Sequence, residues 1–224
     1  MDWQAVWLTV RLAATTSAIL LVVGMPIAAW LAFSTRRWTG LVEALVALPL
    51  VLPPTVLGFY LLVAMGPNGP LGRLTEGLGI GLLPFTFEGL VLASVLYSLP
   101  FAVQPMTVAF DAVDRGLIET AWTLGRSRTA TFVRVVLPLS AGGVVTGVVL
   151  SFAHTIGEFG VVLMIGGNLP GATRTISIAI YDDVQALDYG GAAALALPLL
   201  AVSFAVLAVV YSVRGRKGTW TAGG

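Results

Sequence analysis

A chain of 224 residues that is 57% hydrophobic and only 10% charged does not have the composition of a soluble domain, because such domains carry about 25% charged residues. The net charge of +1 gives no sign of a nucleic-acid partner, and the absence of cysteine excludes disulfides and cysteine-ligated metal sites. With a mean hydropathy of +0.94, the composition predicts an integral membrane protein, and the long charge-free runs described next predict that it is all-α.

Five charge-free runs are long enough to cross a bilayer, which takes about 20 residues. They are Leu12–Thr35, Ala44–Gly72, Gly89–Phe110, Val135–Gly157 and Tyr189–Val213. We expect a single transmembrane domain over residues 1–224, with spans at about 8–35, 44–65, 88–110, 135–162 and 190–213 and a cytoplasmic loop at 111–134. The chain begins Met1-Asp2 without a basic segment, so the first run is predicted to be an uncleaved span.

The positive charges indicate how the spans are oriented. An odd number of spans puts most of the basic residues on one side: Arg36, Arg37, Arg115, Arg126, Arg128, Arg134, Arg214, Arg216 and Lys217. The other side has Arg73 and Arg174, with Arg11 near the first interface. Because cytoplasmic loops carry the excess of Lys and Arg, the sequence predicts a multi-pass inner (cytoplasmic) membrane protein with its N-terminus outside and its C-terminus in the cytoplasm.

The second run contains Pro49, Pro53 and Pro54, and each proline removes a backbone donor. We expect this span to be kinked or unwound near Pro53-Pro54, either as part of a substrate route or as a structural kink against neighbouring helices. Pro100 and Pro105 in the third run leave the same two alternatives. The Gly- and Pro-rich stretch between these runs, residues 66–86, is predicted to be a compact outer loop that either docks a partner or only connects.

The longest polar interruption runs from Asp111 to Pro138. Within it, apolar or small residues recur at helical spacing and define one face that a partner groove could bury: Ile118, Ala121, Trp122 and Gly125. Gly125 lies where a chain that leaves a helix often needs a residue in the left-handed conformation. Glu119 is placed to contact a cation on the partner. The alternative is an amphipathic loop that lies on the lipid with its arginines at the headgroups.

The fourth run has small or polar residues every three or four positions: Gly143, Gly147, Ser151, His154 or Thr155, and Glu158. A Gly-x-x-x-Gly pair is typical of close helix packing, whereas a carboxylate within a span must face protein or water. His154 lies one turn before Glu158 and could pair with it. Since no further ligand or nucleophile is apparent, we interpret this as a structural pair at a subunit or pathway interface, with no metal site and no catalytic residue.

Beyond the fourth run, apolar residues recur at helical spacing and predict a short amphipathic helix on the outer leaflet: Ile176, Ile180, Val184 and Leu187. Asp182 and Asp183 would lie on its polar side.

The Asp111–Pro138 segment resembles the EAA loop of permease subunits of bacterial ABC importers. It has the spacing Glu119-x-Ala121-x-x-x-Gly125, then nine residues, Val135, one residue and Leu137-Pro138. Thr120 replaces the usual second alanine and Val135 the usual isoleucine. The resemblance implies a cytoplasmic coupling helix that contacts an ATPase through the following residues: Glu119, Ala121, Trp122, Gly125, Arg126, Leu137 and Pro138.

Further motifs resemble those of permeases of molybdate importers, and this resemblance runs from about residue 40 to about residue 190. They are Leu48–Pro54 with Gly58 and Met65-Gly66, Phe152 with Gly157–Gly160, Gly167-Asn168-x-Pro170-Gly171-x-x-Arg174-Thr175 and Ala179–Asp182. Tungstate and sulfate or thiosulfate permeases are close relatives and remain alternatives.

The resemblance implies a type I importer permease fold and a homodimer bound to two ATPase subunits and to an extracytoplasmic oxyanion-binding protein. ATP and Mg would sit on the ATPase, and this chain would bind no cofactor. It contains no P-loop sequence, and Lys217 is its only lysine, so the subunit itself is predicted not to be an enzyme.

The pathway candidates are Pro53, Pro54, Gly143, Gly147, Ser151, His154 and Glu158. Two other classes of function compete. An ion-coupled secondary transporter would be expected to show internal repeats, which are not apparent, and an intramembrane enzyme would need a fuller constellation than one histidine and no cysteine.

Overall fold

The computed structural model describes residues 2–215, and every regular element within them is helical. The first helices are α1 (Trp3–Phe33), α2 (Thr39–Val51), α3 (Pro54–Met65), α4 (Pro70–Gly77) and α5 (Phe87–Asp111). A run of short elements follows: α6 (Arg115–Thr123), α7 (Arg128–Thr131), the π-helical turn η1 (Phe132–Val136) and α8 (Leu137–Leu139). The last are α9 (Ala141–Gly157), α10 (Gly160–Gly166), α11 (Ile176–Gln185) and α12 (Tyr189–Gly215). Arg216 and Lys217, used above to orient the chain, lie outside the described residues.

Three of the described helices are long and apolar enough to cross a bilayer, namely α1, α5 and α12. The number rises to five if each of two bent pairs counts as one span. Helices α2 and α3 meet at an angle of 112° around Leu52 and Pro53. The predicted span 44–65 is therefore broken near Pro53-Pro54, where the sequence predicts a kink. By contrast, α5 continues through Pro100 and Pro105 without interruption.

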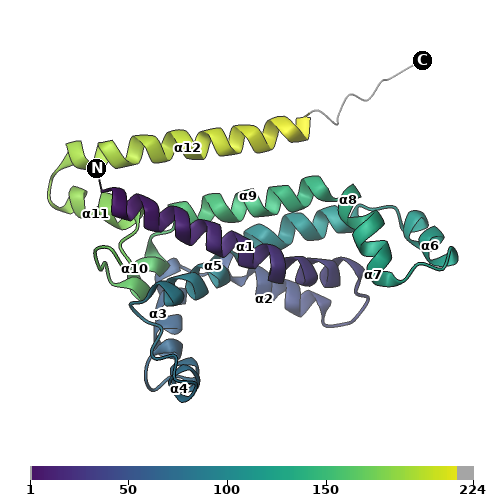
Figure 1. Ribbon diagram of the computed structural model, residues 1–224, viewed down its shortest axis with the longest axis horizontal. Coiled ribbons are helices and arrows are strands. Elements are labelled where there is room, and N and C mark those ends of the chain that lie inside the picture. The colour runs from purple at the N-terminus through teal and green to yellow at the C-terminus, as the bar shows by residue number, and fades with distance from the viewer. Residues whose placement is uncertain (1, 216–224) are drawn as a thin grey trace.

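The centre of the molecule is a bundle of α1, α5 and α9, whose axes run along its long dimension (Figure 1). A first cluster lies between α1 and α5, near the end of the molecule that carries α6. It includes Leu20, Val103, Met106 and Phe110. Near the other end, Leu12, Leu90 and residues of α3 and α10 form a second cluster. The two clusters hold the central helices together over most of their length, which fixes the positions of the segments at both ends.

Close approach of α5 and α9 depends on two glycines. A Cβ on Gly143 would lie 2.1 Å from Ala109 Cβ, and a Cβ on Gly147 would lie 2.7 Å from the Ala102 carbonyl oxygen. Both distances are far below van der Waals contact. The Gly143-x-x-x-Gly147 stripe therefore packs α9 against α5 within one chain.

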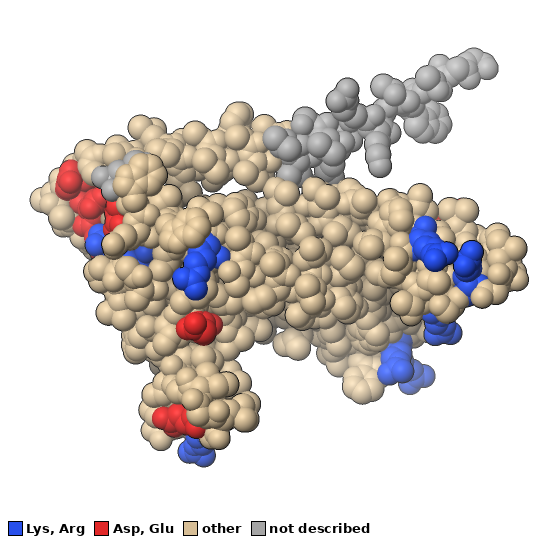
Figure 2. Space-filling model, in the orientation of Figure 1, with Lys and Arg blue, Asp and Glu red and all other residues tan. Residues whose placement is uncertain are grey.

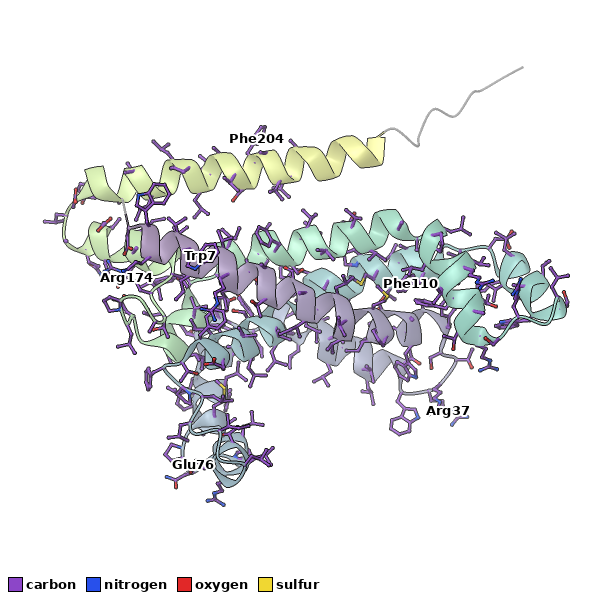
Figure 3. All side chains as sticks on the ribbon, in the orientation of Figure 1. Trp7, Arg37, Glu76, Phe110, Arg174 and Phe204 are labelled. Atoms are coloured by element: carbon purple, nitrogen blue, oxygen red, sulfur yellow. The ribbon has the colours of Figure 1, made fainter. Side chains whose placement is uncertain are left out.

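The periphery is strongly apolar. Helix α12 packs mainly on α11 and on α9. Its Leu197, Leu200 and Phe204 side chains are each about two-thirds or more exposed. Figure 3 shows Phe204 pointing away from the other helices. In water such a surface would be costly, whereas in a bilayer it contacts lipid or another membrane protein.

Two segments differ from their sequence-based expectations. The stretch 66–86 was expected to be a loop but contains α4, which follows the C-terminal end of α3 and projects from the bundle (Figure 1). The amphipathic helix after the fourth run ends at Gln185, so Leu187 is not on its apolar face. Leu187 instead has a φ of 60° and is 72% exposed, because it lies in the turn that leads into α12.

The α5–α9 contact predicts opposite outcomes for two adjacent glycines. Gly143→Ala should destabilise the protein by about 1–3 kcal/mol because the added methyl group overpacks the interface. Gly142→Ala is the matched control, since no atom lies within 4 Å of the position that its Cβ would take. The measurement is thermal unfolding of the purified protein in detergent. A Gly143→Ala melting temperature as high as that of Gly142→Ala would contradict the packing.

Candidate coupling segment and helix breaks

The polar segment 111–138 folds as helix α6, a tight turn and a return through α7, η1 and α8. Asp114 starts α6 by accepting a hydrogen bond from the Gly116 amide at 2.8 Å through Oδ1. The helix ends in a Schellman arrangement, in which the Arg126 amide donates to the Ala121 carbonyl at 3.0 Å and the Gly125 amide to the Trp122 carbonyl at 2.9 Å. Gly125 has a φ of +78°, which is the left-handed conformation expected for it.

The expected single apolar face of α6 is divided in two. Ile118 and Ala121 are buried, and Ile118 joins the core cluster with Phe110 and Val136 of the same chain. These two residues are therefore already covered by their own chain, and burial of the face by a partner stays a prediction for the exposed residues. Glu119 is exposed and Trp122 is 46% exposed, so they remain available to a partner.

The return segment redirects the chain into α9. Ser127 Oγ accepts a hydrogen bond from the Ala130 amide at 3.2 Å and starts α7. Leu137 and Pro138 follow the π-helical turn and form the start of α8. Beyond them the chain bends by 75° into α9, and Ser140 Oγ donates to the Ala109 carbonyl at 3.1 Å. The bend is thus anchored to the end of α5.

Charge is distributed unequally along the molecule. Figure 2 shows basic side chains gathered at the end that carries α6 and α7 and acidic ones near α11 at the other end. The basic end has Arg36, Arg37, Arg115, Arg126, Arg128 and Arg134. Around α11, Arg174 pairs with Asp182 at 3.2 Å and with Asp2 at 3.8 Å.

The break between α2 and α3 lies against the break between α9 and α10. Pro54 is the first residue of α3, and a Cβ on Gly160, the first residue of α10, would lie 2.8 Å from Pro54 Cβ. Further along, a Cβ on Gly58 would lie 2.8 Å from Met164 Cβ. Helices α3 and α10 therefore pack closely, and the two segments of irregular backbone lie next to each other.

Buried hydroxyl groups connect the central helices beside these breaks. Ser98 Oγ of α5 lies 2.9 Å from both His154 Nδ1 and Thr155 Oγ1 of α9. Ser151 Oγ lies 3.4 Å from Ser17 Oγ of α1. The His154 ring stacks on Phe101, with ring centroids 3.9 Å apart. His154 is therefore held by α5 and not by Glu158.

The expected His154–Glu158 pair is not formed. Helix α9 ends at Gly157, and Glu158 has extended backbone angles, so the two side chains do not share a helical face. The Glu158 side chain is buried, and neither carboxyl oxygen has a hydrogen-bond partner among the described residues. Ser94 Oγ on α5 is also buried without a partner. Within residues 2–215, no group of three His, Asp or Glu side chains could hold a metal ion.

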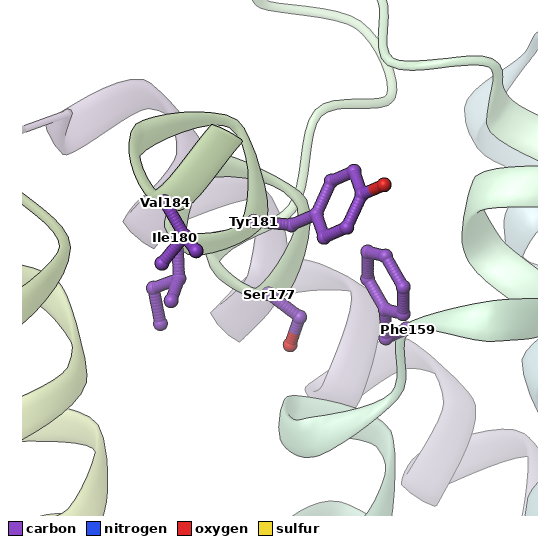
Figure 4. Close-up of a pocket in the computed structure, with 5 residues that line it drawn as sticks. All are labelled: Phe159, Ser177, Ile180, Tyr181 and Val184. Atoms are coloured by element: carbon purple, nitrogen blue, oxygen red, sulfur yellow. The ribbon is translucent and has the colours of Figure 1, made fainter. Parts of the chain in front are cut away.

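An open cleft of about 350 Å³ lies beside the α9–α10 break (Figure 4). Its lining consists of Phe159, Ser177, Ile180, Tyr181 and Val184. The Phe159 and Tyr181 rings face one another with centroids 5.0 Å apart. The lining is mostly apolar, so this cleft offers few groups that could bind an anion.

Comparison with known proteins identifies the family. Residues 24–217 match the family described as "Binding-protein-dependent transport system inner membrane component". The chain belongs to this family of membrane permeases. It is 56% identical to the "Molybdenum transport system permease protein ModB" of Azotobacter vinelandii over 96% of both chains. It is 36% identical to the Escherichia coli K12 protein of the same name, over 94% of this chain and 92% of that one.

A more distant relative of the permease is the "Probable sulfate transport system permease protein cysT" of Prototheca wickerhamii, 35% identical over 75% of this chain and 66% of that one. Two solved structures share the fold. A bacterial alginate ABC transporter in complex with a pentasaccharide-bound periplasmic protein matches with a TM-score of 0.71 and 16% identity, over 96% of this chain and 80% of that one. The MetNI methionine ABC transporter matches with a TM-score of 0.69 and 16% identity, over 95% and 96%. The permease therefore has the type I ABC importer fold.

Sequence reasoning did not single out several residues that shape the permease's polar segment. Asp114 and Ser127 start α6 and α7, and an Asp or Ser just before a helix was a usable signal. Arg115 contacts α1 across a separation of 83 residues. No pattern in the sequence points to that contact, because it depends on how the helices are arranged.

Proposed function

We propose that this permease is the membrane-spanning subunit of an ATP-driven molybdate importer, through which the oxyanion crosses the membrane. The observation that carries the proposal is the 56% identity to a molybdenum transport permease over 96% of both chains.

The polar segment supports a role in coupling to a separate ATPase. It forms a projecting end of the molecule, exposes Glu119, Trp122 and Leu124, and is surrounded by arginines. The excess of positive charge favours a cytoplasmic position for this end, which would put the N-terminus outside. The projecting α3–α4 arm would then lie at the outer side, where an oxyanion-loaded binding protein would dock. In the complete importer, two copies of the permease would bind two ATPase subunits.

The adjoining helix breaks support a substrate route. Irregular backbone at membrane depth is tolerated where it is covered by protein or lines a watery path, and the two breaks meet at Pro54 and Gly160. Among the described residues, Arg11 of α1 is the only Lys or Arg that lies within a span and away from its ends, and its side chain is exposed. A divalent oxyanion would therefore meet hydroxyls, backbone amides and helix ends, and it would be bound weakly and released. Selectivity would lie mostly in the binding protein.

Sulfate is the second candidate cargo because a sulfate permease is 35% identical over 75% of the chain. Tungstate is a further candidate because it is chemically close to molybdate.

The proposal predicts that ATP hydrolysis in proteoliposomes holding the permease and its ATPase rises when molybdate-loaded binding protein is added. Stimulation by the sulfate-loaded form alone would move the cargo to sulfate. Absence of stimulation by molybdate, tungstate and sulfate, in a complex shown to be intact, would contradict the proposed function.

Charge reversal at Glu119 tests the coupling role. Glu119→Lys should reduce co-purification of the ATPase severalfold, because an exposed carboxylate facing a cation would become a like-charge contact. Insertion into the membrane should be unchanged. Glu76→Lys on α4 is the matched control, since Glu76 is an exposed glutamate at the other end of the molecule (Figure 3). Equal recovery of the ATPase with both variants would count against Glu119 as a coupling residue.

A further inference from the structure

Arg115 joins the coupling helix α6 to the end of α1. Its Nη2 donates to the Ala32 carbonyl oxygen at 3.0 Å, and the same nitrogen lies 3.0 Å from Asp111 Oδ1 at the end of α5. Its guanidinium also lies over the Phe33 ring, 4.9 Å from the centroid. One side chain at the start of α6 thus contacts the cytoplasmic-facing ends of two central helices.

The contact suits the chemistry of a helix end. Ala32 is in the last turn of α1, where carbonyl groups lack partners within the helix and carry partial negative charge. A guanidinium that donates there satisfies a carbonyl and places a positive charge at a favourable position. The Arg115 and Asp111 side chains are 52% and 66% exposed, so their ion pair contributes little to stability. The contacts that join α6 to α1 are the hydrogen bond to Ala32 and the guanidinium over the Phe33 ring.

At the opposite end of α1, Thr9 contacts the first turn of α11. Its Oγ1 accepts a hydrogen bond from the Ile176 amide at 2.8 Å and donates to the Ala5 carbonyl at 2.8 Å. Thr9 is fully buried. The Ile176 amide is the first of α11 and has no partner within that helix. Helix α1 runs from Trp3 to Phe33 without a break, with Pro26 inside it, so one helix connects the two contacts.

We propose that α1 transmits movement of the coupling helix to α11 at the outer end, with Arg115 and Thr9 as the positioning residues at its two ends. The inference rests on the proposed function, because it assumes that ATP binding moves α6. A shift of α6 would displace α1 through the Arg115 contacts, and the Thr9 hydrogen bond would carry the displacement to α11. Tyr181 of α11 packs against Phe159 in the α9–α10 break, with ring centroids 5.0 Å apart, so the shift would reach that break.

The test is the ratio of ATPase activity with loaded binding protein to basal ATPase activity, measured on the permease–ATPase complex in proteoliposomes. Arg115→Ala should lower this ratio by about twofold to thirtyfold, the range seen when residues along a coupling element are changed. Basal activity and co-purification of the ATPase should be unchanged. Arg115→Lys should restore part of the ratio, because lysine keeps the charge and one donor. Arg134→Ala, an exposed arginine on η1, is the charge-matched control.

Two outcomes would overturn the role of Arg115. An unchanged ratio in Arg115→Ala would mean that the contact transmits nothing. Loss of the ATPase from the purified complex would make Arg115 a docking residue instead. Both differ from failure of the proposed function, in which the unmodified complex itself would show no stimulation.

A double-mutant cycle tests whether α1 connects the two contacts. Thr9→Val removes the hydroxyl at nearly constant volume, Thr9→Ser keeps it, and Thr107→Val is the control, because Thr107 donates only within its own helix, to Val103. Thr9→Val should lower the ratio while Thr9→Ser does not. If both contacts act through α1, combining Arg115→Ala with Thr9→Val should cost no more than the larger single effect. Multiplying effects would show independent sites and overturn the proposal.

Discussion

Backbone amides and carbonyls must find partners inside the protein, because lipid offers none. Continuous helices such as α1 and α5 meet most of this requirement through their own hydrogen bonds, except at their ends and at interior prolines. The broken pairs α2–α3 and α9–α10 do not, and the structure places their breaks against each other, with Pro54 beside Gly160. The close packing of α3 on α10 depends on this contact. The position of the route that we propose for the oxyanion depends on it as well.

The coupling segment shows how a protruding helix can be both fixed and available. Ile118 and Ala121 bury one side of α6 against the chain's own core, while Glu119 and Trp122 stay exposed. The start of α6 is capped by Asp114, and its end closes in a Schellman turn at Gly125. A helix held on one side can transmit force from a partner that contacts its other side. A loop lying loosely on lipid would lack this attachment.

Much of the fold could be predicted from the sequence because its signals are local. Charge-free runs, the Pro53-Pro54 pair and Gly125 each act through the backbone of their own segment. The expected His154–Glu158 pair was wrong because it assumed that the helix continues past Gly157. Whether a helix ends depends on the surrounding packing as well as on its residues. The burial of Ile118 by its own chain and the Arg115–Ala32 contact could not be predicted, because both join segments that are far apart in the sequence.

The central claim is that the segment 111–138 and the α3–α4 arm lie on opposite sides of the membrane. The chain has no cysteine, so single cysteines can be introduced and labelled without background. Leu78 just beyond α4 is 66% exposed and Leu124 beyond α6 is 76% exposed. In intact spheroplasts, a membrane-impermeant maleimide should label Leu78→Cys, whereas Leu124→Cys should be labelled only after the membrane is permeabilised. Labelling of Leu124→Cys from outside, with Leu78→Cys protected, would contradict this orientation and the coupling role built on it.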